Sequence, residues 1–325
     1  MASEELQGLL VLPDPSTASV DFVRGVELPR LAPERIGPDT IRLGLLEDGR
    51  EFRLSLRDLY RHAYIIGMTG SGKSTLLWNM ALRLRATGGA TVVVIDPHGD
   101  LELDILSSID SLNRVYLLDP LRKPFGLNPL DLPRLPDRDH AISLAVDQLI
   151  AIFEKVLKLP ETAVNVRYLL QILLRLMYSK TDSPTLGDIY NAIVGLKLGT
   201  LDLPVDDPEW RIQTEMLQKL QDQTFLSALS RLEPFAHNKL LSRITSRTTI
   251  VLEEMLKPDS LVLFRISKAE LGEGLLQLLA SSIILRLWFY VLERAMLGKP
   301  RTPIIVFIDE FSEYGGATGC GDYII

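Results

Sequence analysis

Eight consecutive residues at positions 67–74 constrain the fold of this chain more than any other segment. Their sequence is Gly-Met-Thr-Gly-Ser-Gly-Lys-Ser, which matches the pattern of a phosphate-binding loop. Such a loop needs a strand before it and a helix after it, because backbone N–H groups and the helix dipole must converge on one anion. The apolar residues 63–66 predict the strand, and residues 74–85 predict the helix. The sequence therefore predicts an α/β fold with a phosphate site.

The residues of the loop and of the first helical turn have different expected roles. The ammonium group of Lys73 adds positive charge at the β- and γ-phosphates, which makes Lys73 a candidate catalytic residue. The hydroxyl of Ser74 is placed to ligate Mg²⁺. The expected cofactors are therefore ATP and Mg²⁺. The expected binding residues are Gly67, Thr69, Gly70, Ser71, Gly72, Lys73, Ser74 and Thr75.

A carboxylate on a neighbouring strand is needed to hold the Mg²⁺, and two apolar strands end in aspartate. One ends at Asp96 and the other at Asp309. We assign the metal to Asp309, because Glu310 directly after it can orient and polarise the attacking water as the catalytic base. Asp96 is followed by Pro97, which offers no base, so Asp96 is the alternative metal residue.

The polar loop after Asp96 has two interpretations that the sequence leaves open. His98 and Asp100 follow a predicted parallel strand, at the edge where such sheets bind ligands. Asp96 and His98 could therefore support the nucleotide contacts from behind. The simpler interpretation is a polar loop that caps the following helix.

The chain is expected to have three regions. Residues 1–60 contain a proline-rich leader and a small β-hairpin with a turn at Asp48-Gly49. Residues 61–135 and 258–325 alternate strands with helices and form a nucleotide-binding core with a mostly parallel sheet. Residues 136–257 lack strands and form an inserted all-helical domain.

These regions follow from the hydrophobic periodicity of individual segments. The expected strands are 19–23, 41–46, 51–56, 63–66, 91–95, 114–118, 261–266 and 303–308, and the expected helices are 74–85, 141–157, 163–177, 186–196, 210–220, 225–232 and 274–297.

Composition limits the partners and the cellular setting. A net charge of -7 argues against a chain that binds nucleic acid over its whole surface, but leaves room for a local basic patch. One basic cluster could form such a patch, and it consists of Arg231, Lys239, Arg243 and Arg247. A solvated helix face is the favoured interpretation of this cluster. The single cysteine, Cys320, excludes an internal disulfide and a cysteine-cluster metal site.

We expect no segment of the sequence to cross a membrane. The most apolar stretch, 275–292, contains Gln277 and Arg286 near its middle, which indicates a buried helix of a soluble domain. The first residues are acidic, unlike a secretory signal. We therefore expect a cytoplasmic protein without a transmembrane segment.

Three segments together resemble the FtsK/HerA superfamily of P-loop ATPases. They are the loop at 67–75, Val-Ile-Asp-Pro-His-Gly-Asp-Leu at 94–101, and Phe-Ile-Asp-Glu-Phe at 307–311. Within that superfamily the chain is most similar to conjugative coupling and type IV secretion ATPases with an all-helical domain. Further similarity lies in Gly-Leu-Asn-Pro-Leu at 126–130 and Leu-Gly-Glu at 271–273.

The resemblance implies a RecA-like motor core that forms a hexameric ring and moves DNA through its channel by ATP hydrolysis. It also implies that Lys73 and Ser74 serve the phosphates and the metal, and that Asp309 and Glu310 are the metal aspartate and the catalytic glutamate. Conjugation or secretion machinery would then be a partner. Two alternatives remain: a secretion ATPase that acts on protein, and a nucleotide-binding paralogue without turnover.

The chain departs from the superfamily after Tyr314, where eleven residues follow without the family's further strands. The core is therefore expected to be truncated at its C-terminal end. One of the strands at 261–266 and 303–308 would then have an open edge. We expect a monomeric or poorly soluble chain with low ATP turnover.

Overall fold

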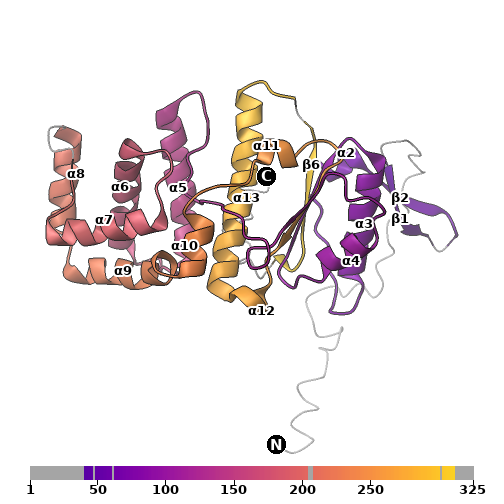
Figure 1. Ribbon diagram of the computed structural model, residues 1–325, viewed down its shortest axis with the longest axis horizontal. Helices are drawn as coiled ribbons and strands as arrows, with labels where there is room; N and C mark the ends of the chain where they lie inside the picture. The colour runs from indigo at the N-terminus through magenta and orange to yellow at the C-terminus, as the bar shows by residue number, and fades with distance from the viewer. Residues whose placement is uncertain (1–39, 47, 61, 204–207, 301, 312–325) are drawn as a thin grey trace, which may run out of the picture. The chain divides into compact units, whose positions relative to one another are not determined.

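The computed structural model describes residues 40–311 apart from 47, 61, 204–207 and 301 (Figure 1). The strands are β1 (Thr40–Leu45), β2 (Glu51–Ser55), β3 (Thr91–Asp96), β4 (Val115–Leu118), β5 (Leu261–Arg265) and β6 (Ile304–Ile308). The helices are α2 (Leu56–Leu59), α3 (Lys73–Thr87), α4 (Leu101–Ser107), α5 (Arg138–Val156), α6 (Val164–Lys180), α7 (Leu186–Leu198), α8 (Pro208–Gln218), α9 (Asp222–Ala236), α10 (Lys239–Thr245), α11 (Leu252–Met255), α12 (Lys268–Leu271) and α13 (Glu273–Met296).

The main sheet is parallel, with its strands in the order β4-β5-β3-β6. The two central strands are almost wholly buried, whereas the edge strands β4 and β6 are mostly half-buried. This difference follows from position, because a central parallel strand is covered on both faces and has a neighbour on each side. The predicted α/β fold with a parallel sheet is confirmed.

Alternate residues of β3 face two separate hydrophobic layers. Val92 and Val94 join a cluster that includes residues of α3, α4 and the start of β1. Val93 and Ile95 join a larger cluster that includes α13 and the helices α5 to α11. Helices therefore cover both faces of the sheet, as expected where parallel strands are joined by crossover connections.

The predicted hairpin is present. β1 and β2 pair antiparallel, with a bulge between Arg42 and Gly44. Gly49 has a φ of 80°, the left-handed conformation that the predicted Asp48-Gly49 turn requires. The turn is further held by Asp48, which accepts hydrogen bonds from the backbone and side chain of Arg50.

Between β4 and β5 the described residues form helices and loops, apart from one isolated bridge between Asp119 and Lys123. Local sequence signals set the helix ends. Asp137 caps α5 by accepting from the N–H groups of the first turn. Thr185 and Asp188 form a capping box at the start of α7, which ends at Gly199 in the left-handed conformation.

The chain segments that enter and leave this helical region are hydrogen-bonded to each other. Gly126 donates to Oγ1 of Thr249, and the N–H of Thr249 donates back to the carbonyl of Gly126. Next to this pair Asn128 is fully buried, and its amide donates to Oδ1 of Asp131 and to the carbonyl of Pro184. The Gly-Leu-Asn-Pro-Leu segment at 126–130 therefore fixes the base of the helical region.

α13 packs between the sheet and the helical region, where it contacts α5 (Figure 1). Among the described helices it is the one with the length and apolar composition of a membrane span, and 67% of its most apolar window is buried in the structure. Arg286 in its middle donates to the carbonyl of Asp131. These properties are typical of a core helix, as the sequence predicted.

One sequence prediction requires correction. Residues 63–66 form no strand: Tyr64 and Ile66 are 80% and 82% exposed, and the segment pairs with no described strand. An apolar segment becomes a strand only where a neighbour completes its hydrogen bonds, and none is paired with this one. Of the two strands expected to have an open edge, β6 lies at an edge of the described sheet, whereas β5 lies between β4 and β3. The predicted strand at 19–23 lies outside the described residues.

Candidate nucleotide-binding site

The backbone of the 67–72 loop has the conformation that its glycines permit. Gly70 and Gly72 have φ values of 79° and 90°, which L-residues rarely adopt. A Cβ at Gly67 would lie 2.4 Å from Oγ of Ser71, so a larger residue there would force the Ser71 side chain to move. Gly72 is also the N-cap of the fifteen-residue helix α3. The loop thus leads directly into a helix N-terminus, where backbone N–H groups are available to an anion.

Lys73 is the first residue of α3, and its side chain folds back over the loop. Its ammonium group donates to the carbonyls of Gly67 at 3.0 Å and Met68 at 3.2 Å. The positive charge is therefore held at the mouth of the loop. Phosphate oxygens bound by the loop would lie within reach of this charge.

Ser74, the next residue, makes the contact that joins the two ends of the core. Its hydroxyl donates to Oδ2 of Asp309 over 2.8 Å. Asp309 follows β6 directly, is 6% exposed, and donates its own N–H to the carbonyl of Ile95 on β3. A hydroxyl and a carboxylate in this arrangement are hard oxygen donors of the kind that Mg²⁺ prefers.

Glu310 has a backbone conformation that is unusual for its residue type. Its φ is 45°, in the left-handed region, and its N–H donates to Oδ1 of Asp309. A non-glycine residue in this region costs free energy, and such residues are concentrated at functional sites. The turn after β6 thus places Glu310 beside the carboxylate that contacts Ser74.

Asp96, the alternative metal residue, has a different set of contacts. Its carboxylate accepts hydrogen bonds from the N–H groups of His98, Gly99 and Leu101, at 2.8–2.9 Å. It therefore stabilises its own loop and the first turn of α4. His98 itself is exposed at the carboxyl end of β3, the strand next to β6.

Comparison with protein families identifies the group to which this architecture belongs. A family model described as "Helicase HerA, central domain" matches residues 41–287, more than half of the chain. The chain belongs to the HerA central-domain family. This family falls within the FtsK/HerA superfamily that the loop and strand-end motifs predicted.

Two curated members of the HerA group are similar to this chain over a limited region. The DNA double-strand break repair helicase HerA of Pyrococcus furiosus is 34% identical over 95 residues, which cover 26% of this chain and 17% of that protein. The protein of the same name from Saccharolobus solfataricus is 33% identical over 104 residues, covering 31% of this chain and 19% of that protein. The matched region thus spans less than a fifth of each curated relative.

Solved structures show the same fold over most of the HerA-family chain. VirB4 of Thermoanaerobacter pseudethanolicus aligns with a TM-score of 0.59 at 16% identity, covering 89% of this chain and 72% of that one. The bacterial conjugative coupling protein TrwBdeltaN70 aligns with a TM-score of 0.54 at 16% identity, covering 86% and 62%. At this identity the similarity concerns the fold, which is that of RecA-like P-loop ATPases.

The carboxyl edge of the sheet carries an ion-pair network that the sequence did not predict. Arg265, the last residue of β5, pairs with Asp119 at 3.0 Å and with Glu270 at 2.8 Å. A Cβ on Gly99 would lie 3.2 Å from Nε of Arg265, so the loop after β3 rests against this arginine. The network joins the ends of β4 and β5 at the carboxyl edge of the sheet. It could not be predicted because its members are distant in the sequence.

Glu102 is a second residue that the sequence analysis missed. It is the second residue of α4, and its side chain is completely buried. Burial, reinforced by the negative charge of Asp96, raises the pKa of Glu102 from its ordinary value of 4.5 to about 10. The available signal was its position: Leu101 and Ile105 are also buried, so Glu102 falls within the inward face of the helix.

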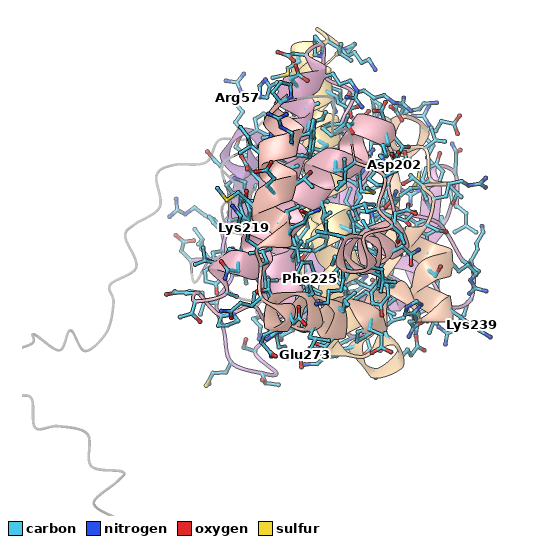
Figure 2. The ribbon with its side chains drawn as sticks, turned by 90° about the vertical axis from the view of Figure 1, so that its left-hand side faces the viewer. Arg57, Asp202, Lys219, Phe225, Lys239 and Glu273 are labelled. Atoms are coloured by element: carbon cyan, nitrogen blue, oxygen red, sulfur yellow. The ribbon has the colours of Figure 1, made fainter. Side chains whose placement is uncertain are left out.

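The basic cluster lies on α9, α10 and the segment that follows. Arg231 is partly buried and donates to the carbonyl of Ser227. Lys239, Arg243 and Arg247 are exposed and form no ion pair with a described residue; Lys239 projects outward in Figure 2. The exposure of these three side chains agrees with a solvated surface and also leaves them accessible to a phosphate backbone.

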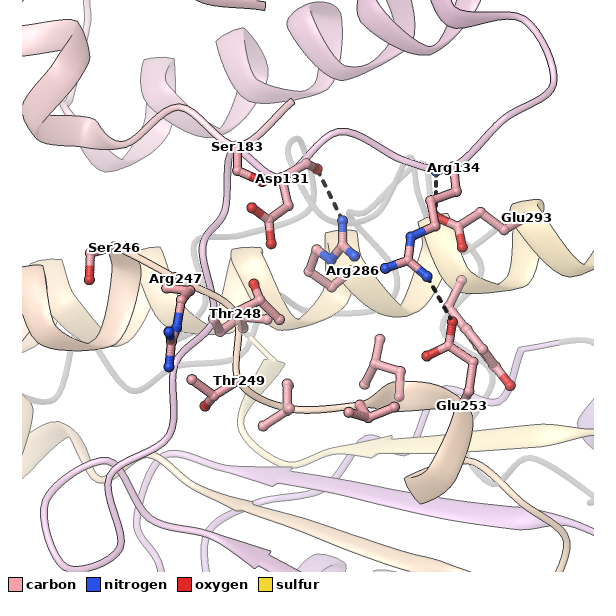
Figure 3. A pocket seen from close by; sticks show the side chains of 15 residues that line it. Asp131, Arg134, Ser183, Ser246, Arg247, Thr248, Thr249, Glu253, Arg286 and Glu293 are labelled. Carbon is pink, nitrogen blue, oxygen red and sulfur yellow. Dashed lines mark hydrogen bonds and ion pairs between the residues drawn. The ribbon is translucent and has the colours of Figure 1, made fainter. Parts of the chain in front are cut away.

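A cavity of about 390 Å³ lies where the helical region joins the core (Figure 3). Arg286 reaches the carbonyl of Asp131 there, and Arg134 forms a long ion pair of 3.9 Å with Glu253. Three arginines and three carboxylates line the cavity, namely Arg134, Arg247, Arg286, Asp131, Glu253 and Glu293. The lining is balanced in charge, so it favours neither an anion nor a cation, and the glycine-rich loop remains the candidate nucleotide site.

Proposed function

We propose that this chain binds Mg²⁺ and ATP at the 67–75 loop and hydrolyses the γ-phosphate, as the motor core of a HerA-type ATPase. The observation that carries the proposal is the hydrogen bond between Ser74 and Asp309. It brings the helix that follows the phosphate loop to the strand end that carries the two acidic residues.

The residues present fit the expected cofactor. Oγ of Ser74 and the carboxylate of Asp309 would hold the Mg²⁺, directly or through water. The bound ion would neutralise charge on the β- and γ-phosphate oxygens. The N–H groups of the loop from Gly67 to Thr75 would surround the phosphates, and Lys73 would exchange its carbonyl contacts for phosphate oxygens.

Glu310 is the residue we propose as the base. Its strained turn holds it next to Asp309, where a carboxylate can accept a proton from water aligned with the γ-phosphate. Asp96 and His98 would support the site without binding the nucleotide directly. Asp96 fixes the loop after β3, and His98 lies one strand away from Asp309. The alternative in which Asp96 holds the metal is less favoured, because three N–H groups already occupy its carboxylate.

We further propose that hydrolysis drives DNA movement. The curated relatives are described as DNA double-strand break repair helicases, which favours DNA over protein as the partner. The predicted division into a core of 61–135 and 258–325 and a helical insertion of 136–257 remains part of this proposal. So do a cytoplasmic location and a role with conjugation or secretion machinery. The hexameric ring is the assembly expected of a longer family member, whereas residues 1–325 alone are expected to be monomeric or poorly soluble with low ATP turnover.

Steady-state ATP hydrolysis with and without duplex DNA tests the proposal, with Glu310→Gln as the matched variant. We expect DNA to stimulate the wild-type protein, and Glu310→Gln to bind ATP but lose at least ~100-fold in hydrolysis. DNA affinity across a salt series should fall steeply, as phosphate contacts require. Hydrolysis that responds to a secreted protein and not to DNA would favour the secretion alternative. Binding without hydrolysis in the wild type would favour the paralogue without turnover.

A further inference from the structure

Glu102 is buried without a hydrogen-bond donor. Its side chain is 0% exposed, and no N–H or hydroxyl of a described residue donates to either carboxylate oxygen. An ionised carboxylate in such a place would be strongly destabilising, because it has lost water and gained no partner. The acid must therefore be neutral, or the residue would be driven out to solvent.

Asp96 is the acidic residue whose negative charge and side chain act on Glu102 and help to raise its pKa. It is 1% exposed, and its two oxygens accept from three backbone N–H groups. A carboxylate has about four acceptor positions, so one remains for a further donor. A protonated Glu102 can supply that donor.

We propose that Glu102 is a protonated carboxylic acid in the folded protein, that it donates a hydrogen bond to Asp96, and that this buried pair positions the 97–100 loop at the carboxyl edge of the sheet. Glu102 is thus a positioning residue that acts through Asp96.

The consequence for the nucleotide rests on the proposed function. The 97–100 loop holds His98 at the end of β3, and the next strand leads to Asp309. α4, which carries Glu102, packs against α3, the helix that begins with Lys73 and Ser74. The buried pair would therefore act on the proposed site through the loop at the carboxyl end of β3 and through the packing of α4 on α3.

Infrared spectroscopy tests the protonation directly and does not depend on ATP. At neutral pH the wild-type protein should show a carboxylic acid C=O band in addition to the carboxylate bands. Glu102→Gln should remove this band, whereas Asp104→Asn, which changes an exposed acid of the same helix, should leave it unchanged. A wild-type spectrum without an acid band assignable to Glu102 would overturn the proposal.

Hydrogen exchange tests the positioning. Glu102→Leu keeps a similar volume but has no donor, so the amides of His98, Gly99 and Leu101 should exchange at least ~10-fold faster than in the wild type. Glu102→Gln, whose amide can replace the donor, should restore wild-type exchange. Equal protection in all three proteins would refute the positioning role, and if Glu102→Leu does not fold, the infrared result decides alone. Both readouts stand even if the wild type binds no ATP, so the two proposals can fail separately.

Discussion

The hydroxyl of Ser74 lies 2.8 Å from Oδ2 of Asp309, although 235 positions separate the two residues in the sequence. The two residues lie on opposite sides of the helical insertion in the sequence. Their contact brings the two parts of the core together at the phosphate loop. It also distinguishes the two strand-end aspartates, since the carboxylate of Asp96 is bound by its own loop.

Ser74 and Asp309 should therefore act as a coupled pair toward Mg²⁺. We expect Ser74→Ala and Asp309→Asn each to weaken Mg²⁺-dependent ATP binding by ~10-fold or more, and the double variant to lose much less than the sum. A coupling free energy of ~0.5–3 kcal/mol is the usual range for residues in contact. Nucleotide titrations with and without Mg²⁺ measure it, with the exposed Ser107→Ala as the control. Fully additive effects would mean that the two side chains serve different sites.

Gly126→Ala should destabilise the fold sharply, because a Cβ at this position would lie 1.9 Å from the carbonyl oxygen of Arg247. Relief of that overlap must separate the segments that enter and leave the helical region. We expect a loss of ~1–3 kcal/mol or more in the free energy of unfolding. Gly44→Ala is the matched control, since nothing lies within 4 Å of its Cβ position. Denaturant titration compares the two variants, and equal stability would show that the Gly126 contact is not maintained in solution.

Glu102 should make the stability of the protein depend on pH. Its pKa is raised from 4.5 in the ordinary state to about 10 in the folded state. The folded protein thus binds one more proton than the unfolded chain between these values. The stabilising contribution is complete below about pH 4.5 and decreases as the pH rises toward 10.

Comparison with Glu102→Gln isolates this effect. Relative to that variant, the wild-type free energy of unfolding should fall by up to ~1.4 kcal/mol per pH unit across the neutral range. Urea titrations at several pH values provide the difference. A difference that does not change with pH would show that Glu102 has the same protonation state in the folded and unfolded protein.

Local patterns were sufficient to predict much of the fold. The β-branched run at 91–95 became the buried strand β3, and the glycines of the loop, read with the residues after them, predicted a helix close to the observed Lys73–Thr87. These features depend on nearby residues, so the sequence contains their cause. The pairing of Ser74 with Asp309 was also foreseeable, because both lie at the carboxyl edge of one parallel sheet.

Other features depend on distant partners. Residues 63–66 have the composition of a strand, yet Ile66 is exposed and no strand in the described part of the chain pairs with the segment. The short helices α10, α11 and α12 are below the length at which periodicity is informative, and tertiary packing stabilises them. The burial of Glu102 likewise depends on how α4 lies against α3 and β3, which no single segment specifies.

The most direct test of the account is a titration of fluorescent ATP, in the presence of Mg²⁺, into the wild-type protein and two lysine variants. Lys73→Ala removes the charge at the mouth of the loop, whereas Lys299→Ala removes an exposed lysine distant in the sequence from the loop. The account predicts that Lys73→Ala loses at least ~100-fold in affinity and that Lys299→Ala binds as the wild type does. Wild-type affinity in the Lys73→Ala protein would contradict the assignment of the nucleotide site.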